Sequence, residues 1–310
     1  MITVNKILCP IDLTPASEEA LRYGVALAAA FDAELIALHC IDGPIVPTES
    51  VLTRTRESVA TAVEKQTKVG QPVNIRWDPI VLVGDPVDAI NTVAAANAVS
   101  LIVIRSRRRP KANILLGSTA ESICRTAPCP VLVTHGHQRE WAGRFTREID
   151  LQRIMVGYDF SDDAELALSY GLALSEEYQA ELHLLNVVKS AAKADYPELA
   201  GLSLTSQREL NATSERLRNA VPEEAFLWCD VKCVTAEGKP YSEIISYAQE
   251  HEIDLICMGV KGSDFGMHAL FGSNVDRVLR QSPCPVLIAR PLKPAMLPAG
   301  KVTERFAWTY

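Results

Sequence analysis

The sequence lacks the features that mark several common classes of protein. It has no apolar run of about 18 residues, the length that a transmembrane helix needs, and no basic N-terminal stretch followed by an apolar core. Its formal net charge of −7 over 310 residues is mild and not basic, which argues against binding to nucleic acid or anionic membranes. With 48% hydrophobic residues, the chain can bury two cores. We therefore expect a cytosolic globular protein without nucleic-acid or membrane partners.

No Cys-x-x-Cys motif occurs among the eight cysteines, and several of them lie inside apolar runs. This distribution predicts buried, reduced thiols. A disulfide between Cys129 and Cys284, which stand between prolines in similar contexts, is the alternative. His135 and His137 lack a third ligand nearby, so we interpret them as linker residues and predict no metal site.

The sequence also lacks a Walker A motif. No water-activating base stands beside its glycine-rich segment, and a single histidine within that segment, His268, is more often a bystander than a catalyst. We therefore assign no catalytic residue, and the only enzymatic activity that we consider is slow hydrolysis of ATP.

The sequence does contain an internal duplication. Lys6–Asp12 matches Arg153–Asp159, and the order of matches is kept along the chain. The further pairs are Gly84-Asp-Pro86 with Gly238-Lys-Pro240, Leu101–Ile104 with Leu255–Met258, Gly117-Ser118 with Gly272-Ser273, and Pro128–Leu132 with Pro283–Leu287. Domains of about 150 residues are common. We predict a first domain over 1–136, a linker over 137–150, a second domain over 151–291 and a tail over 292–310.

Each repeat alternates short apolar runs with helical patterns, which predicts an α/β fold with an open parallel sheet. Continuous apolar runs are typical of strands that are covered on both faces. The predicted strands are Lys6–Ile11, Leu35–Cys40, Asn74–Val83, Leu101–Ile104, Val131–Thr134, Arg153–Tyr158, Glu181–Val188, Ala225–Ala236, Leu255–Met258 and Val286–Ala289. The predicted helices are Ser17–Ala30, Glu49–Val69, Pro86–Ala98, Ser118–Arg125, Ala164–Glu177, Leu204–Asn219, Tyr241–His251 and Ser273–Gln281.

One glycine-rich segment of the second repeat has the pattern of a nucleotide loop. A buried strand is followed by Gly259-x-x-Gly262, and Gly272-Ser273 then opens a helix. Glycine permits sharp turns and close approach to a ligand, and a helix N-terminus favours phosphate. Ligands of open α/β sheets bind beyond the carboxyl ends of the strands. Asp159, Val187 and Gly259 end three strands, so we expect them at one crevice.

On these residues the chain resembles the universal stress protein family in its tandem form. The motifs are Gly157-Tyr-Asp159-Phe-Ser161, the strand that ends at Val187, Met258-Gly-Val-Lys-Gly262 followed by Gly272-Ser-Asn274, and Pro283–Ile288. The resemblance covers the chain apart from the linker and tail. It implies two tandem doubly wound domains of the adenine nucleotide alpha hydrolase-like type. Each would be an open five-stranded parallel sheet with helices on both faces, and the two would pair through their last strands.

The resemblance also implies ATP or another adenine nucleotide as ligand of the second domain, with Mg²⁺ as a candidate companion. Adenine would lie near Asp159 and Val187. The candidate site residues are Gly157, Tyr158, Asp159, Phe160, Val187, Met258, Gly259, Val260, Lys261, Gly262, Gly272, Ser273, Asn274 and Val275, with the phosphates at Gly262, Gly272, Ser273 and Asn274. Local alternatives stay open: a turn or cap role for Asp159, packing for Val187, a helix cap for Ser273 and a solvated side chain for Lys261.

The first repeat departs from this pattern. Arg105 and Arg108 stand where the second repeat has Gly259 and Gly262. A side chain at such a position would strain the loop or block a phosphate. The interpretation that we favour is a first domain that has lost nucleotide binding and serves as a scaffold. Binding of a different anion by the arginines and a merely solvated basic loop are the alternatives.

Three hypotheses for function follow. The leading one is a stress-response protein that binds an adenine nucleotide in its second domain and thereby biases a conformation or an interface. The second is a slow ATPase, and the third is a nucleotide-independent scaffold for another ligand or a protein partner. A homodimer of tandem chains stays open in all three.

Overall fold

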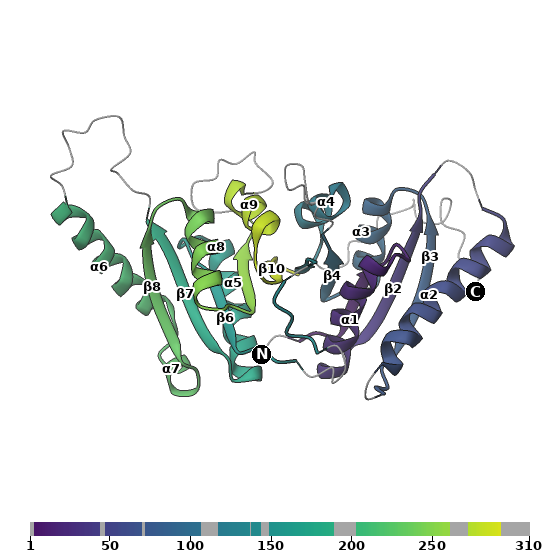
Figure 1. Ribbon diagram of the computed structural model, residues 1–310, viewed down its shortest axis with the longest axis horizontal. Coiled ribbons are helices and arrows are strands. Elements are labelled where there is room, and N and C mark those ends of the chain that lie inside the picture. Colours follow the sequence, from purple (N-terminus) through teal and green to yellow (C-terminus); the bar gives the residue numbers. More distant parts are fainter. Residues whose placement is uncertain are drawn as a thin grey trace.

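The computed structural model describes residues 3–43, 47–69, 72–106, 117–136, 138–143, 149–188, 203–260 and 272–292, the side chains of 203–207 excepted. Its two halves repeat the same alternation of strands and helices (Figure 1). The elements of the first half are β1 (Lys6–Pro10), α1 (Pro15–Ala30), β2 (Glu34–Ile41), α2 (Glu49–Lys68), β3 (Trp77–Val83), α3 (Pro86–Ala96), β4 (Leu101–Arg105), α4 (Ser118–Thr126) and β5 (Val131–Thr134).

The second half has the same order with one added helix. Its elements are β6 (Arg153–Gly157), α5 (Asp162–Tyr178), β7 (Glu181–Val188), α6 (Ser203–Ala220), α7 (Ala225–Trp228), β8 (Val231–Glu237), α8 (Pro240–Glu250), β9 (Leu255–Gly259), α9 (Ser273–Gln281) and β10 (Val286–Ala289).

All ten strands form one sheet in the order β3-β2-β1-β4-β5-β10-β9-β6-β7-β8. Neighbours within each half are parallel, whereas β5 and β10 are antiparallel, with Leu132 opposite Leu287. Two five-stranded parallel sheets are therefore joined edge to edge through their last strands, as predicted. Antiparallel pairing of equivalent strands relates the two halves by an approximate two-fold axis at the Leu132–Leu287 pair, and it removes two exposed sheet edges.

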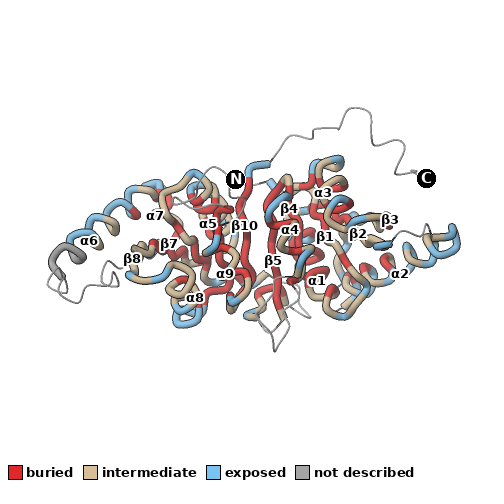
Figure 2. The backbone as a smooth tube through the Cα atoms, turned by 90° about the horizontal axis from the view of Figure 1, so that it is seen from above, coloured by how far each residue is buried: buried red, intermediate tan, exposed pale blue. Residues whose placement is uncertain are grey.

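A hydrophobic core covers each face of the sheet and runs across both halves. One core packs α1, α2, α5 and α6 on the sheet, and the other packs α3, α4, α8 and α9 on the opposite face. The buried backbone is continuous through β5 and β10 at the centre of the molecule (Figure 2). Within the described part of the chain, no helix combines the length and the apolar character that membrane crossing requires.

The strand that we predicted over Ala225–Ala236 was wrong in its first part. Ala225–Trp228 forms the short helix α7, and β8 begins only at Val231. Ala225 and Cys229 are buried, and the Cys229 thiol lies 3.2 Å from the carbonyl oxygen of Ala180. An apolar run that is buried at these positions is compatible with a helix or a strand, so the run alone did not separate the two.

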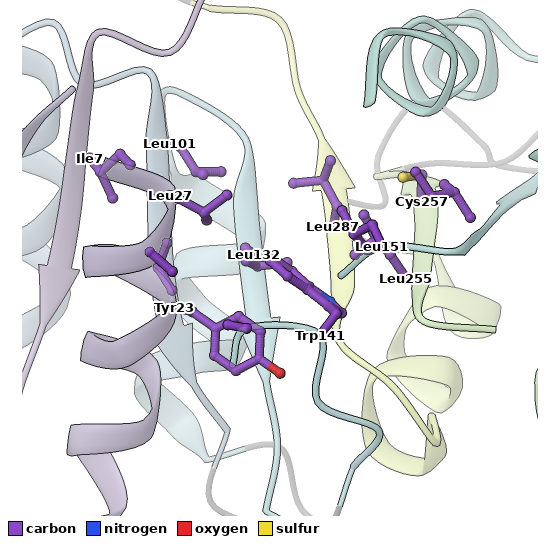
Figure 3. Close-up of a cluster of buried hydrophobic side chains, with 14 of the residues drawn as sticks. Ile7, Tyr23, Leu27, Leu101, Leu132, Trp141, Leu151, Leu255, Cys257 and Leu287 are labelled. Atoms are coloured by element: carbon purple, nitrogen blue, oxygen red, sulfur yellow. The ribbon is translucent and has the colours of Figure 1, made fainter. Parts of the chain in front are cut away.

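The predicted linker contributes to the core. Trp141 and Ala142 are buried, at 3% and 0% exposure, and Trp141 packs edge-on against Tyr23 of α1 with 4.7 Å between ring centroids. Trp141 belongs to the same buried cluster as Leu132 of β5 and Leu287 of β10 (Figure 3). The linker therefore adds hydrophobic surface at the junction between the two halves.

The cysteines are free thiols, as predicted, and six of the eight are buried. Burial raises the pKa of the Cys124, Cys129 and Cys284 thiols to about 12. Cys129 and Cys284 do not form the alternative disulfide. Thiols with raised pKa values in an apolar core are poor nucleophiles, so these residues serve as small apolar side chains.

His183 of β7 makes stability depend on pH. Its ring is 1% exposed, and Nδ1 lies 2.8 Å from the hydroxyl of Tyr247. Burial lowers the pKa of His183 below its ordinary 6.5, and the Glu181 carboxylate opposes that shift only in part. Between the folded-state pKa and 6.5, the unfolded chain binds more protons than the folded one, so stability falls as pH falls through 6.5.

We therefore expect the free energy of unfolding to decrease by up to about 1.4 kcal/mol per pH unit from this histidine below pH 6.5. Urea unfolding between about pH 7.5 and 5.5 measures the slope. His183→Asn keeps a polar group near the Tyr247 hydroxyl but removes the titration, so its slope should be shallower. An equal slope in the variant would assign the dependence to other groups.

Candidate functional site

The turn after β6 is held by its own side chains. The Asp159 carboxylate accepts hydrogen bonds from the backbone N–H and the hydroxyl of Ser161, at 3.2 and 2.6 Å. The Ser161 hydroxyl in turn accepts from the Ala164 N–H at the start of α5, at 3.2 Å. Asp159 thus has the turn role that was one of the alternatives left open for it, and Ser161 is the N-cap of α5. This turn fixes the Asp159 carboxylate at the carboxyl edge of the sheet.

Aromatic residues flank this turn. Phe160 has a φ of 64°, and its ring lies 5.2 Å from that of Tyr158. The Arg216 guanidinium of α6 stacks on the Phe160 ring at 3.9 Å. Burial and the neighbouring Glu165 carboxylate raise the pKa of Tyr158 to about 12, and the phenol donates to Glu165 at 3.2 Å. Tyr158 is therefore a neutral donor and not a general base.

The strands next to β6 bring the other predicted residues to the same edge. Gly157 lies opposite Met258 of β9 on one side and Leu185 of β7 on the other. Two residues beyond Leu185, Val187 is partly buried in the core. The Asn186 side chain donates to the Tyr158 carbonyl at 2.7 Å and ties β7 to the turn. The ends of β6, β7 and β9 therefore lie side by side at the carboxyl edge of the sheet.

Gly259, at the end of β9, is explained by packing within the protein. A Cβ at Gly259 would lie 2.6–2.7 Å from the Asp163 carbonyl carbon, carbonyl oxygen and Cβ in the first turn of α5. Its backbone is part of the strand. Close contact with α5 thus requires glycine here, which is a different reason from the sharp turn and ligand approach that we expected.

A backbone hydrogen bond joins the residues on either side of the glycine loop. The Gly272 N–H donates to the Val260 carbonyl at 3.1 Å, which joins the end of β9 to the start of α9. The first intrahelical bond of α9 runs from the Asp276 N–H to the Gly272 carbonyl, so the N–H groups of Ser273, Asn274 and Val275 lie outside the helical pairing.

The N-cap of α9 is Gly272 itself, without a side-chain cap, and Ser273 is the first helical residue and is exposed. The helix-cap alternative for Ser273 is thereby removed. These backbone donors form an anion-favouring helix end. Lys261 and Gly262 lie outside the described residues.

The first half has a cavity of about 670 Å³ at the equivalent edge. It lies between the ends of β1 and β4 and the start of α4, and its lining includes Asp12, Cys40, Ile90, Arg105 and Ser118. Gly117 caps α4 with a φ of 25°, a value that suits glycine. The sequence indicated a degenerate loop here, but the crevice persists because strand ends and helix starts form it.

Arg105 is held by its own domain in this cavity. Its guanidinium forms an ion pair with Glu19 and donates to the Ala16 carbonyl at 2.9 Å. Burial raises the pKa of Glu19, and the Arg105 charge opposes that shift. An arginine neutralised in this way is a poor anion ligand, which weakens the anion-binding alternative at this residue. Arg108 lies outside the described residues.

Comparison with known proteins decides the family. The model of the universal stress protein family matches residues 3–135 and 151–290, which is most of the chain and both of its halves. The chain belongs to the universal stress protein family.

Several universal stress proteins are similar to this chain. One from Methanocaldococcus jannaschii is 30% identical over 141 residues, spanning 45% of this chain and 82% of that protein. One from Mycolicibacterium smegmatis is 25% identical over 305 residues, covering 92% of this chain and 97% of its own length. The universal stress protein crystal structure from Archaeoglobus fulgidus has a TM-score of 0.63 at 23% identity, over 93% of this chain and 98% of that one, and it supports the tandem fold.

Proposed function

We propose that this universal stress protein binds ATP or a related adenine nucleotide in its second domain and acts as a nucleotide-responsive regulator of the stress response. The observation that carries the proposal is the bond from the Gly272 N–H to the Val260 carbonyl. It closes the glycine loop at the edge where the Asp159 turn lies, and it directs the start of α9 to the same edge.

Each part of the nucleotide has a matching group in this proposal. The Asp159 carboxylate accepts from the adenine amino group, and Val187 provides an apolar contact for the ring. The N–H groups of Ser273 and Asn274 hold the phosphates at the positive end of the α9 dipole. Gly262 lies in the sequence between Gly259 and Gly272, and its lack of a side chain would leave room for the phosphates.

The second domain is favoured over the first because of the loop residues. Gly259 leaves the end of β9 without a side chain, whereas Arg105 fills the equivalent place and is engaged by Glu19. The 670 Å³ first-domain cavity gives room for a ligand, but its loop lacks the glycines that a phosphate cradle requires. One nucleotide site per chain is therefore proposed.

A regulatory effect has a route to the other domain. Arg280, in the last turn of α9, pairs with Asp276 at 2.7 Å and reaches Glu121 of α4 in the first domain at 3.3 Å. A ligand at the start of α9 therefore acts on a helix that contacts the opposite half. If the nucleotide binds more tightly to one arrangement of the Arg280–Glu121 contact than to another, it shifts the populations of the two arrangements.

The matched aspartates of the two domains test the proposal. Calorimetric titration of nucleotide-free protein with ATP, with and without Mg²⁺, should show binding. Asp159→Ala should weaken it about tenfold or more, the effect of losing one hydrogen bond to a charged group. Asp12→Ala makes the same change in the first domain and should leave the affinity unchanged. No heat and no thermal shift with ATP in the unaltered protein would refute the proposal, and equal losses in both variants would refute the domain assignment.

A further inference from the structure

A second cavity, of about 210 Å³, lies beside the approximate two-fold axis. It stands on the α1 and α5 face of the sheet, near the amino ends of β4 and β9, away from the carboxyl edge that holds the proposed nucleotide site. Equivalent residues from the two halves line it in pairs: Leu27 with Leu174, Leu101 with Leu255, and Leu132 with Leu287.

Within its described residues, the linker places one aromatic side chain, Trp141, at this symmetric space. Trp141 packs edge-on against Tyr23 at 4.7 Å between centroids (Figure 3). Tyr170 of α5 corresponds to Tyr23 of α1 in the duplication, and it lines the cavity. A duplicated chain has two equivalent faces but a single linker, so one face receives an aromatic ring and the other retains a cavity.

Among the described residues that line this cavity, the charged side chains are those of Glu176 and Glu177 near the end of α5. Both residues are exposed, so they stand where the cavity meets solvent. The rest of the lining is mainly apolar, with Tyr170 and Ser100 as polar members and Trp141 as one wall. An occupant therefore needs an apolar body and gains from a positive charge at one end.

We propose that this cavity binds a small aromatic amine, one aromatic ring that carries a short alkylammonium group. The ring lies against Tyr170 as Trp141 lies against Tyr23, and edge-on aromatic pairs add to the energy of burial. The ammonium meets Glu176 and Glu177. A cavity of about 150 Å³ in another protein holds benzene, so 210 Å³ suits one ring with a short side chain.

The probe for this test is 2-phenylethylamine, titrated by calorimetry and by tryptophan fluorescence, in which Trp141 reports on the cavity wall. The amine should bind more tightly than 2-phenylethanol, and 3-phenylpropionate should bind most weakly. Glu176→Gln with Glu177→Gln should weaken the amine about threefold to fivefold, as for an exposed ion pair, and leave the alcohol unchanged. Glu57→Gln on the exposed face of α2 is the matched control.

Filling the cavity tests its location. Ala173 is a half-buried cavity residue on α5, and Ala173→Trp should abolish binding of both amine and alcohol while ATP binding persists. Trp141→Phe keeps the wall apolar, should remove the fluorescence response and should retain the calorimetric one. No binding of the amine to the unaltered protein, or unchanged binding in a folded Ala173→Trp variant, would overturn the proposal.

The same chemistry occurs in the chain itself, since residues 293–310 include Phe306, Trp308 and Tyr310 together with Lys301 and Arg305. The ligand could therefore be a free aromatic amine or the chain's own tail. A full-length variant with Phe306→Ser, Trp308→Ser and Tyr310→Ser distinguishes these two sources. Equal affinity for 2-phenylethylamine would support a free amine as the ligand. Tighter binding of 2-phenylethylamine in the variant would support the same site, with the tail as a competitor for it. Absence of amine binding in both proteins would contradict the proposed site.

Discussion

Replacement of Arg290 by alanine is expected to lower the free energy of unfolding by about 3–5 kcal/mol, the range for removing one partner of a buried charged interaction. Arg290 follows β10 and is 8% exposed. Its guanidinium donates to the carbonyls of Cys124, Arg125 and Ala127 at the end of α4 in the other half, with 2.6 Å to Cys124 and 3.0 Å to Ala127.

The magnitude follows from what the substitution leaves behind. The last carbonyls of a helix have no intrahelical partner and carry the negative end of its dipole. Burial lowers the pKa of Arg290, yet an arginine stays protonated. Alanine would leave the α4 carbonyls buried without this donor and would open a cavity between the two halves.

Arg125→Ala provides the comparison for urea unfolding. Arg125 pairs with Glu121 at 2.6 Å on the surface of α4 and is 39% exposed, so its loss should cost about 1 kcal/mol or less. The loss of unfolding free energy for Arg290→Lys should lie between those for Arg290→Ala and Arg125→Ala, because one ammonium lacks the planar fork of donors that reaches three carbonyls. A loss for Arg290→Ala as small as that for Arg125→Ala would contradict the assigned role in joining the domains.

Gly259→Ala is expected to destabilise the protein by about 2–3 kcal/mol, in the upper range for overpacking of a core. The added Cβ would meet two backbone atoms and the Cβ of Asp163 at 2.6–2.7 Å, so α5 and the end of β9 would have to separate. A backbone neighbour cannot rotate away as a flexible side chain can, which is why the effect is large for one methyl group.

Gly157→Ala is the matched control at the end of the adjacent strand. Its Cβ would lie 3.5–3.7 Å from the Ile244 and Met258 side chains, which is ordinary contact. We expect a change within about 1 kcal/mol in either direction. Equal destabilisation by the two substitutions would show that close contact with α5 is not what requires glycine at position 259.

Local sequence was sufficient for most of the elements. The predicted bounds of Val131–Thr134, Glu181–Val188, Ser273–Gln281 and Val286–Ala289 agree with the structure. Continuous apolar runs between helical patterns specify strands that are buried on both faces, and a duplication constrains each half by the other. The pairing of the two domains through their last strands came from the family resemblance.

The predictions that failed or changed depend on contacts between distant residues. No local signal places Trp141 against Tyr23, because a single tryptophan in a polar linker gives no periodicity. The helix over Ala225–Trp228 shares its apolar residues with a strand pattern. Glu19 and Arg105 are far apart in sequence, so their ion pair, which holds Arg105, was invisible from the loop residues alone.

We propose that this duplicated chain holds one nucleotide, in its second domain. The most direct measurement is the stoichiometry of ATP binding to nucleotide-free protein by calorimetry, in the unaltered chain and in Gly262→Arg, which introduces the first repeat's residue. We expect one ATP per chain in the unaltered protein and none in the variant, which should keep its unfolding transition. Two ATP per chain, or one ATP that still binds to Gly262→Arg, would rule out a single site in the second domain.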